Sequence, residues 1–346
     1  MSYVVSTGTL CASTRGARYT QAMAISLGAR FVTNWTTAAG ALEGVLNFLG
    51  TPLPRHAIMG LTGHAWHTCL GSREGIVALP SGPVDLDWEA ACARYARLGW
   101  QWERFGAVLR PGDDWAEMRF AAAAWARPFL DSGRPLIGWD FHLHEHAVVY
   151  GYDDERGGFL VDHVLSGDAG PFASWDDWPS KLGLLELFAP VRAAEMDPVE
   201  AIAGALETAL SCFAGGDGPD DGQARGTAAL DAWATAMDAE TEVDRAGNAY
   251  TLAVLQTARL DGYAFLADVA EALPDIARPL NQAITALKAE TQALSPLLTL
   301  FPFPSGGHGN VANAGLRRGA AMALRRAAEH ERTAAAAITE ALTGFE

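Results

Sequence analysis

The sequence is poor in cysteine, has fewer basic than acidic residues, and contains no long apolar run. Its four cysteines are widely and irregularly spaced across 346 residues, without a C-x-x-C pair. Such spacing indicates neither a zinc ribbon nor a disulfide framework. No uncharged apolar stretch reaches the roughly 20 residues that span a bilayer, and the N-terminus lacks the basic segment and apolar core of a secretory signal. We therefore expect reduced thiols in a cytoplasmic protein.

Acidic residues exceed basic residues by 41 to 25, which gives a formal net charge of −16. A chain with this charge repels nucleic acid and anionic membrane surfaces and attracts cations. The sequence therefore predicts no nucleic-acid or membrane partner and favours a cationic small molecule or a basic partner. Solubility alone is the alternative explanation of the charge.

Hydrophobic periodicity divides the chain into a mixed part and a helical part. In the mixed part, helices are expected at 36–49, 88–98 and 114–131, and strands at 100–109, 135–141, 146–152, 157–164 and 182–191. Beyond Asp197, helices are expected at 198–213, 227–240, 247–273, 276–298 and 311–343. We therefore predict an α+β domain with an antiparallel sheet over residues 1–195, followed by an all-α helical bundle over residues 196–346.

The densest polar cluster lies in a predicted β-hairpin. His146 begins its first strand, Asp162 lies near the end of its second, and a strong turn at 153–158 joins the two. Antiparallel pairing about this turn places His146 and Asp162 opposite each other or one register step apart. A carboxylate beside an imidazole is the base-and-orienter half of a catalytic triad. A polar pair at a sheet edge is the alternative.

The segment GRPLIGWDFHLHEHAVVYGYDDERGGFLVDH resembles the second half of papain-like domains in two related groups. These are the bacteriocin-processing cysteine peptidases and, more closely, the butirosin-biosynthesis acyltransferase family. WTTAAGALEGVLNFLG and PLPRHAIMGLTGHAW resemble the first half of such domains. LDAWATAMD, TARLDGYAFLADVAEAL and LFPFP resemble the helical extension of some butirosin-type members. The resemblance covers most of the chain and implies a papain-like fold and acyl-transfer chemistry.

The resemblance implies that His146 is a general base and that Asp162 orients it. The family's nucleophilic cysteine falls at Thr37, with Thr36 as the next candidate, and neither is a cysteine. A hydroxyl is far harder to activate than a thiol. Asn34 falls where the family has its oxyanion-stabilising side chain, and the helix N-terminus would add N–H donors. Plain N-capping is the alternative role for Thr36 and Thr37.

Further side chains are expected near the substrate. Those proposed to contact it, besides Asn34 and Thr36, are Trp35, His64, Trp66 and His144. Cys69 and Cys11 are the only thiols considered for a role, with ordinary packing as the alternative. His142, His144 and His146 alternate on a strand and would share one metal-binding face, but H-x-H-x-H is not a stereotyped ligand spacing. We expect neither a metal nor another cofactor.

Three functions remain open from the sequence. The first is an acyltransferase of natural-product biosynthesis, which moves an acyl group from a carrier thioester to an amine with His146 as base. The second is a catalytically retired papain-like protein that binds a small molecule, a peptide or a carrier protein, as the missing cysteine suggests. The third is a metal-dependent enzyme that uses the histidines. The partners would be a small-molecule amine or an acyl-carrier substrate, and the amphipathic C-terminal helix leaves a homodimer open.

Overall fold

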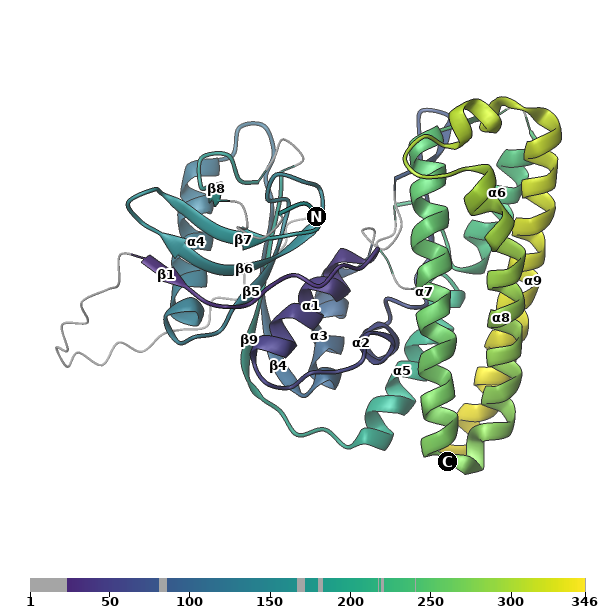
Figure 1. Ribbon diagram of the computed structural model, residues 1–346, viewed down its shortest axis with the longest axis horizontal. Coiled ribbons are helices and arrows are strands. Elements are labelled where there is room, and N and C mark those ends of the chain that lie inside the picture. Colours follow the sequence, from purple (N-terminus) through teal and green to yellow (C-terminus); the bar gives the residue numbers. More distant parts are fainter. Residues whose placement is uncertain are drawn as a thin grey trace.

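The computed structural model describes residues 24–80, 86–166, 172–179, 183–216, 218, 221–239 and 241–345. The first part of the chain is α+β and contains a seven-stranded antiparallel sheet, as predicted (Figure 1). The strands lie in the order β4-β9-β5-β6-β7-β8, and β1 pairs with β6. Their bounds are β1 (Ala24–Ser26), β4 (Trp100–Val108), β5 (Leu136–Trp139), β6 (His146–Asp153), β7 (Gly158–Asp162), β8 (Phe172–Ser174) and β9 (Leu184–Ala193).

Helices cover both faces of this sheet. They are α1 (Thr37–Phe48), α2 (Arg55–Thr62), α3 (Trp88–Arg94) and α4 (Trp115–Asp131), and a 3₁₀ turn, Tyr95–Leu98, extends α3. Side chains alternate along a strand, so neighbouring residues of β6 enter different cores. Val148 joins the core that contains α1, whereas Val149 joins the core that contains α4. In Figure 1, α1, α2 and α3 lie between the sheet and the helices of the second part.

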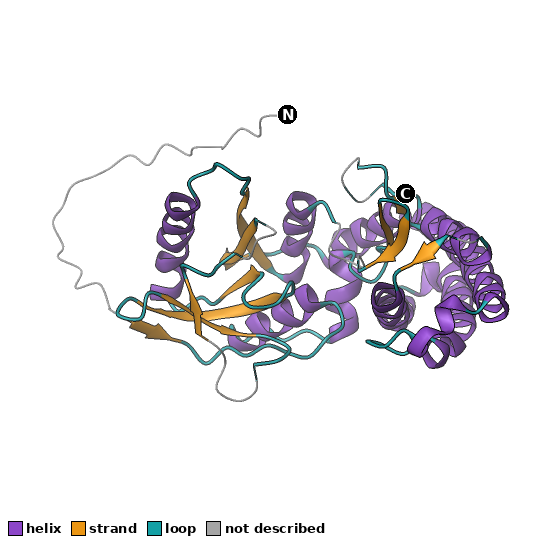
Figure 2. Cartoon of the chain, turned by 90° about the horizontal axis from the view of Figure 1, so that it is seen from above, coloured by secondary structure: helices purple, strands orange, loops and turns teal. Residues whose placement is uncertain are grey.

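The second part is helical, also as predicted. Its helices are α5 (Pro198–Phe213), α6 (Thr227–Asp238), α7 (Arg245–Ala272), α8 (Ala277–Leu300) and α9 (Ala314–Leu342). Asp197 caps α5 by accepting hydrogen bonds from the backbone N–H groups of Val199 and Glu200, which offsets unpaired donors of the first turn. Figure 2 shows these helices gathered at one end of the molecule, beside the sheet-containing part.

A second, smaller sheet was not predicted. It has the order β10-β2-β3-β11 and joins β2 (Cys69–Arg73) and β3 (Ile76–Leu79) to β10 (Ala224–Arg225) and β11 (Glu242–Val243). The first two strands come from the α+β part, and the last two precede α6 and α7. The short sheet therefore connects the two parts of the chain.

The hydrophobic core also crosses from one part to the other. One continuous core cluster contains Leu42 of α1, Ile58 of α2, Leu206 of α5, Leu266 of α7 and Ile338 of α9. The two parts therefore share an interior, although their secondary structure differs.

A buried arginine adds polar contacts to this junction. Arg259 of α7 donates hydrogen bonds to the carbonyl oxygen of Ala65 (2.6 Å) and to Oγ1 of Thr68 (2.7 Å). The same guanidinium forms ion pairs with Glu331 and, at 3.2 Å, with Glu290, and all three side chains are fully buried. Burial and the neighbouring Glu331 raise the pKa of the Glu290 carboxyl well above its ordinary value.

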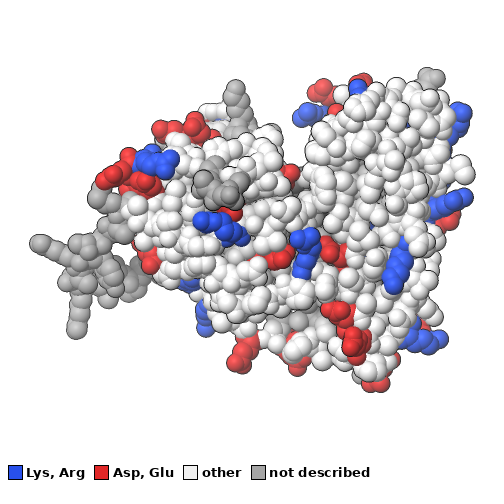
Figure 3. Space-filling view, in the orientation of Figure 1, with Lys and Arg blue, Asp and Glu red and all other residues white. Residues whose placement is uncertain are grey.

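The lengths of the helices and the distribution of surface charge can be compared with the predictions about membrane and cationic partners. Within the described ranges, no helix is both long enough and apolar enough to cross a membrane. On the face shown in Figure 3, acidic and basic side chains stand singly or in small groups among uncharged ones. That face therefore has no continuous acidic patch of the kind that would guide a cation to one place.

Candidate active site

A small cleft lies where the sheet-containing part meets the helical part. It is lined by Trp35, Thr36, Thr37, Ala38, Trp88, Glu145, His146 and Tyr250. The centre of a water molecule has about 10 Å³ of space there, which is room for about one water. Four of the predicted site residues therefore share this cleft, and the other four lining residues (Ala38, Trp88, Glu145 and Tyr250) were not predicted as site residues.

The hydroxyl of Thr37 joins the start of α1 to the start of β6. Its Oγ1 donates a hydrogen bond to Oε2 of Glu145 (2.7 Å) and accepts one from the backbone N–H of His146 (3.1 Å). Thr36 occupies the N-cap position of α1, but no side chain caps this helix. The first N–H groups of α1 thus receive no side-chain acceptor, which leaves the positive end of the helix available to an anionic group.

The imidazole of His146 is surrounded by aromatic rings. Ring centroids of Trp88, Trp139 and Phe188 lie 4.7, 4.9 and 6.2 Å from its own. Burial lowers the pKa of His146 to about 3, so the ring is neutral at neutral pH. Among the described residues, Nε2 of His146 has no hydrogen-bond partner. A pKa this low makes the free imidazole a weak base, so a bound ligand would have to raise the pKa of His146 before the ring could accept a proton.

Asp162 lies diagonal to His146. The register of β6 and β7 places Asp162 opposite Val148, two residues along the strand from His146. Oδ2 of Asp162 accepts a hydrogen bond from the backbone N–H of Phe31 (2.9 Å). Asp162 therefore fixes the segment that leads into α1, and its predicted role as the orienter of His146 stays a prediction.

Two further buried polar atoms near the start of α1 have no hydrogen-bond partner among the described residues. They are Nδ2 of Asn34 and Oγ1 of Thr36, on side chains 4% and 3% exposed. The other amide atom of Asn34, Oδ1, accepts a hydrogen bond from the backbone N–H of Thr36 (2.9 Å). An unpaired buried polar group costs about 1–3 kcal/mol. Together with Nε2 of His146, these atoms lie at the start of α1 or β6 and have hydrogen-bonding capacity that no described residue uses.

Glu145 is the one carboxylate that lines the cleft. Besides the Thr37 hydroxyl, it accepts a hydrogen bond from the Tyr250 hydroxyl, which reaches Oε1 from α7 at 3.3 Å. Burial raises the pKa of the Glu145 carboxyl, and the two hydrogen bonds act in the opposite direction. The only sequence signal for Glu145 was its place inside the His-rich run that ends at His146.

Three aromatic rings from separate segments meet beside this carboxylate. The ring centroids of Trp35 and Tyr250 are 6.4 Å apart, those of Trp35 and Phe303 are 5.6 Å apart, and those of Tyr250 and Phe303 are 5.7 Å apart. Trp35 and Phe303 are 41% and 46% exposed. We call Trp35, Tyr250 and Phe303 the aromatic cluster; two of its members belong to the helical part.

The loop before β6 has strained backbone geometry. Asp140 and His142 have positive φ angles, of 68° and 72°, a conformation that costs energy in residues other than glycine. The backbone N–H of Asp140 donates to the carbonyl oxygen of Glu145 (3.1 Å) and closes the loop. This closed loop presents Glu145 and His146 to the cleft.

Four predicted substrate-contacting residues do not line the cleft: Asn34, His64, Trp66 and His144. Two of these, His64 and Trp66, lie in the interior. His64 is fully buried, and its Nε2 forms a hydrogen bond with the Tyr95 hydroxyl (3.2 Å). Trp66 is also fully buried and packs edge-on against Phe213 and Phe265. His64 lies behind Trp88, which separates it from the cleft, and Trp66 belongs to the core between the two parts.

The alternating histidines have separate partners. Nδ1 of His144 contacts Asp140 (2.9 Å), and Nε2 of His142 contacts the carbonyl oxygen of Phe172 (3.1 Å). Throughout the part of the chain that the structure describes, no group of three or more candidate ligands is placed to hold a metal ion. Cys69 is buried in the interior, and Cys11 lies outside the described residues.

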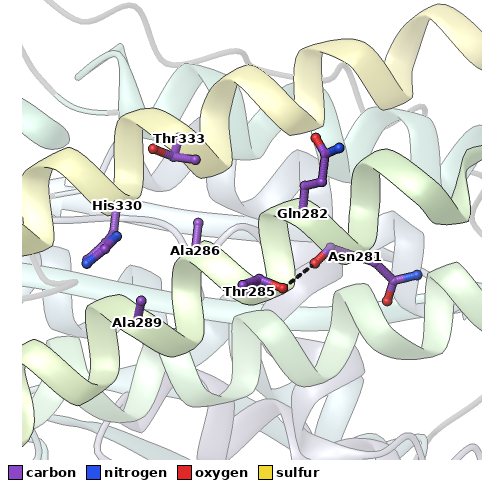
Figure 4. A pocket seen from close by; sticks show the side chains of 7 residues that line it. All are labelled: Asn281, Gln282, Thr285, Ala286, Ala289, His330 and Thr333. Atoms are coloured by element: carbon purple, nitrogen blue, oxygen red, sulfur yellow. Dashed lines mark hydrogen bonds between the residues drawn. The ribbon is translucent and has the colours of Figure 1, made fainter.

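A larger hollow lies elsewhere on the molecule. It is an open groove of about 510 Å³ between α8 and α9, lined by Asn281, Gln282, Thr285, Ala286, Ala289, His330 and Thr333 (Figure 4). Its lining consists of small, amide and hydroxyl side chains with a single histidine. The smaller cleft at Thr37 is the candidate active site, because two of its lining residues, Thr36 and His146, each have a buried polar atom without a hydrogen-bond partner among the described residues.

The comparisons with known proteins add no family. No protein-family model matches the chain, and no curated protein sequence matches it.

Proposed function

We propose that this protein is a papain-like acyltransferase that moves an acyl group from a carrier thioester to an amine, which attacks the thioester directly. The likeness of its motifs to the butirosin-type acyltransferases suggested the chemistry. The layout of the cleft supports it, because the N-terminus of α1 packs beside the first residue of β6, His146. A helix N-terminus that faces a strand-borne histidine provides an anion site next to a base.

One observation carries the proposal. Nε2 of His146, Oγ1 of Thr36 and Nδ2 of Asn34 are buried and unpaired within the described residues, and all belong to segments at the start of α1 or β6. A thioester would pair these atoms: Asn34, Thr36 and the first N–H groups of α1 would hold the carbonyl oxygen, on which negative charge develops. His146 would face the attacking nitrogen.

The proposed reaction balances with the groups present. The nitrogen of the amine attacks the thioester carbonyl carbon, so that a C–N bond forms and the C–S bond breaks. His146 accepts the proton that the nitrogen loses and returns it to the leaving thiolate. Thr37 does not form an acyl intermediate in this scheme, because its hydroxyl already donates to Glu145.

Release of free thiol tests the proposal. Purified protein is mixed with N-acetylcysteamine thioesters of several acyl chains and a panel of primary amines, and thiol release is recorded with and without amine. We expect amine-dependent release, a fall of about 10²-fold or more in His146→Gln, and a loss of less than tenfold in Thr37→Val. His330→Gln, a histidine of the α8/α9 groove, is the matched control and should match the wild type. A collapse in Thr37→Val would instead indicate a threonine nucleophile.

A retired, ligand-binding protein is the second candidate. The room for about one water in the cleft and the threonine at the nucleophile position favour it. This candidate predicts that thioesters or amines bind without any release of thiol above the uncatalysed rate. The same assay, run beside an equilibrium binding measurement, separates the two functions.

A further inference from the structure

Among the described residues, the Glu145 carboxyl group has two hydroxyl partners and no ion pair with a lysine or arginine; burial raises its pKa, and the charge of the neighbouring His144 acts in the opposite direction. Thr37 and Tyr250 donate to its two oxygens, and no lysine or arginine within the described ranges forms an ion pair with it. Carboxylates that are largely removed from water are normally paired with a positive charge. The cleft thus contains a buried carboxyl group that no lysine or arginine of the described residues neutralises, and burial raises its pKa. A bound cation would stabilise its ionised form.

The aromatic cluster adds a second feature that attracts a cation. The rings of Trp35, Tyr250 and Phe303 meet at interplanar angles of 56–88°, so their faces point in different directions. The faces of aromatic rings attract cations within about 6 Å of the ring centre. No described lysine or arginine lies over any of these three rings. Ring faces beside a carboxylate are the combination that binds organic ammonium groups.

The size of the cleft narrows the ligand class. It has room for about one water, and a primary ammonium group is close to water in size. A trimethylammonium group would have to displace Trp35 or Tyr250. Nε2 of His146 is unpaired in the same cleft, and an ammonium group is a donor that pairs with it.

We propose that Glu145, Tyr250, Trp35 and Phe303 form a binding site for a primary ammonium group on an unbranched chain. The role of this ligand as the attacking amine rests on the proposed acyl transfer, in which the ammonium group first gives one proton to the Glu145 carboxylate and then attacks as the neutral amine. Binding itself does not require turnover. Glu145 supplies the counter-charge, the aromatic cluster excludes bulkier head groups, and the nitrogen is held beside His146.

Equilibrium binding of three matched probes tests this site. The probes are n-butylammonium, n-butyltrimethylammonium and butan-1-ol, titrated at pH 7.5 and constant ionic strength with ligand-observed NMR. We expect n-butylammonium to bind at least about tenfold more tightly than either of the other two, because only it combines the charge with the size. Equal affinities for the three, or no saturable binding of n-butylammonium, would overturn the proposal.

Variants assign the binding to this cleft. Glu145→Gln keeps the shape and removes the charge, and it should weaken n-butylammonium about tenfold. Trp35→Leu, at a half-exposed position where folding is not at risk, should weaken it about threefold. Glu155→Gln, on the exposed β6–β7 turn, is the matched control and should leave affinity unchanged. Wild-type affinity in both Glu145→Gln and Trp35→Leu would refute the site.

The two proposals fail separately. Selective binding of n-butylammonium without thiol release would leave the ammonium site standing and exclude acyl transfer. Amine-dependent thiol release without selective binding of n-butylammonium would support acyl transfer and exclude the ammonium site.

Discussion

The imidazole of His146 is held neutral by the rings around it, and this has a consequence for stability. Burial lowers its pKa to about 3 in the folded chain, against about 6.5 in an unfolded chain. Between these values the unfolded state binds a proton that the folded state does not. The contribution of neutral His146 to the free energy of unfolding is therefore fully present above pH 6.5. It is lost progressively as the pH falls from 6.5 toward 3.

Removal of this imidazole should flatten that dependence. Each pKa unit corresponds to about 1.4 kcal/mol, so a shift from 6.5 to about 3 makes His146 contribute a loss of about 5 kcal/mol over the whole range. We expect the free energy of unfolding of the wild type to fall more steeply from pH 7 to pH 5 than that of His146→Gln. Urea titrations at each pH measure both. His64, whose pKa burial also lowers, is present in both proteins and contributes to the slope of both curves. If the free energy of unfolding fell equally with pH in the wild type and in His146→Gln, the conclusion that the folded chain holds His146 neutral would be wrong.

Single residues of the site differed in how far the sequence revealed them. His146 was predicted because it begins a hairpin with a strong turn, whereas Thr37 was predicted from the family resemblance, which places the nucleophile position at the start of the first helix. Glu145 was not predicted as a site residue, because its position in the cleft depends on Tyr250, which is 105 residues away in the chain. Phe303 was missed for the same reason: its contacts to Trp35 and Tyr250 are all long-range.

At the scale of the element, α1 owes its position to its glycines. A Cβ on Gly44 would lie 2.0 Å from the carbonyl oxygen of Arg30, and one on Gly40 would lie 2.3 Å from that of Val32. The helix therefore lies directly against the backbone of the segment that precedes it. That segment contains Phe31 and Asn34, so the close approach also places site residues.

Gly44→Ala should consequently destabilise the protein. Alanine favours a helix over glycine by about 1 kcal/mol, but the clash with the backbone costs more, and we expect a net loss of about 1–3 kcal/mol. Gly319→Ala, in the exposed part of α9, meets nothing within 4 Å and should gain about 0.5–1 kcal/mol. Thermal unfolding followed by circular dichroism compares the two. Stabilisation by both substitutions would show that α1 is not held by close backbone contact.

Elements with strong periodicity were predicted, and weakly patterned ones were not. The helices of the second part and the hairpin β6–β7 followed from apolar spacing and turn residues. The helix α2 was missed because its eight residues follow two prolines and carry no capping side chain. The strands β2 and β3 were missed because they lack alternation, and they depend on β10 and β11 for pairing.

At the scale of the whole molecule, the buried Arg259 holds the helices together and joins them to the first part. Replacement by methionine would leave Glu331 and Glu290 buried without their cation. We expect Arg259→Met to lose about 3–5 kcal/mol of stability in urea. Arg278→Met removes an exposed ion pair with Glu340 and should cost less than about 1 kcal/mol. Similar losses in the two variants would mean that burial does not set the strength of the Arg259 cluster.

The boundary at residue 195, which was drawn from the change in periodicity, separates two patterns of secondary structure. It does not separate two interiors, because the largest core cluster draws on α1 and α2 as well as on α5, α7 and α9. Periodicity reports local structure, and only three-dimensional packing reveals which faces are buried together. We therefore expect one cooperative unfolding transition in calorimetry rather than two.

The shared interior also bears on inheritance. A recombination event that separated the two parts of the gene would leave the apolar face of α2 without α7, and the strands β2 and β3 without their outer partners. Neither product would have a complete core. We therefore expect the two parts to be inherited together. A helical part from a related protein should replace this one only if α2 and the small sheet are replaced with it.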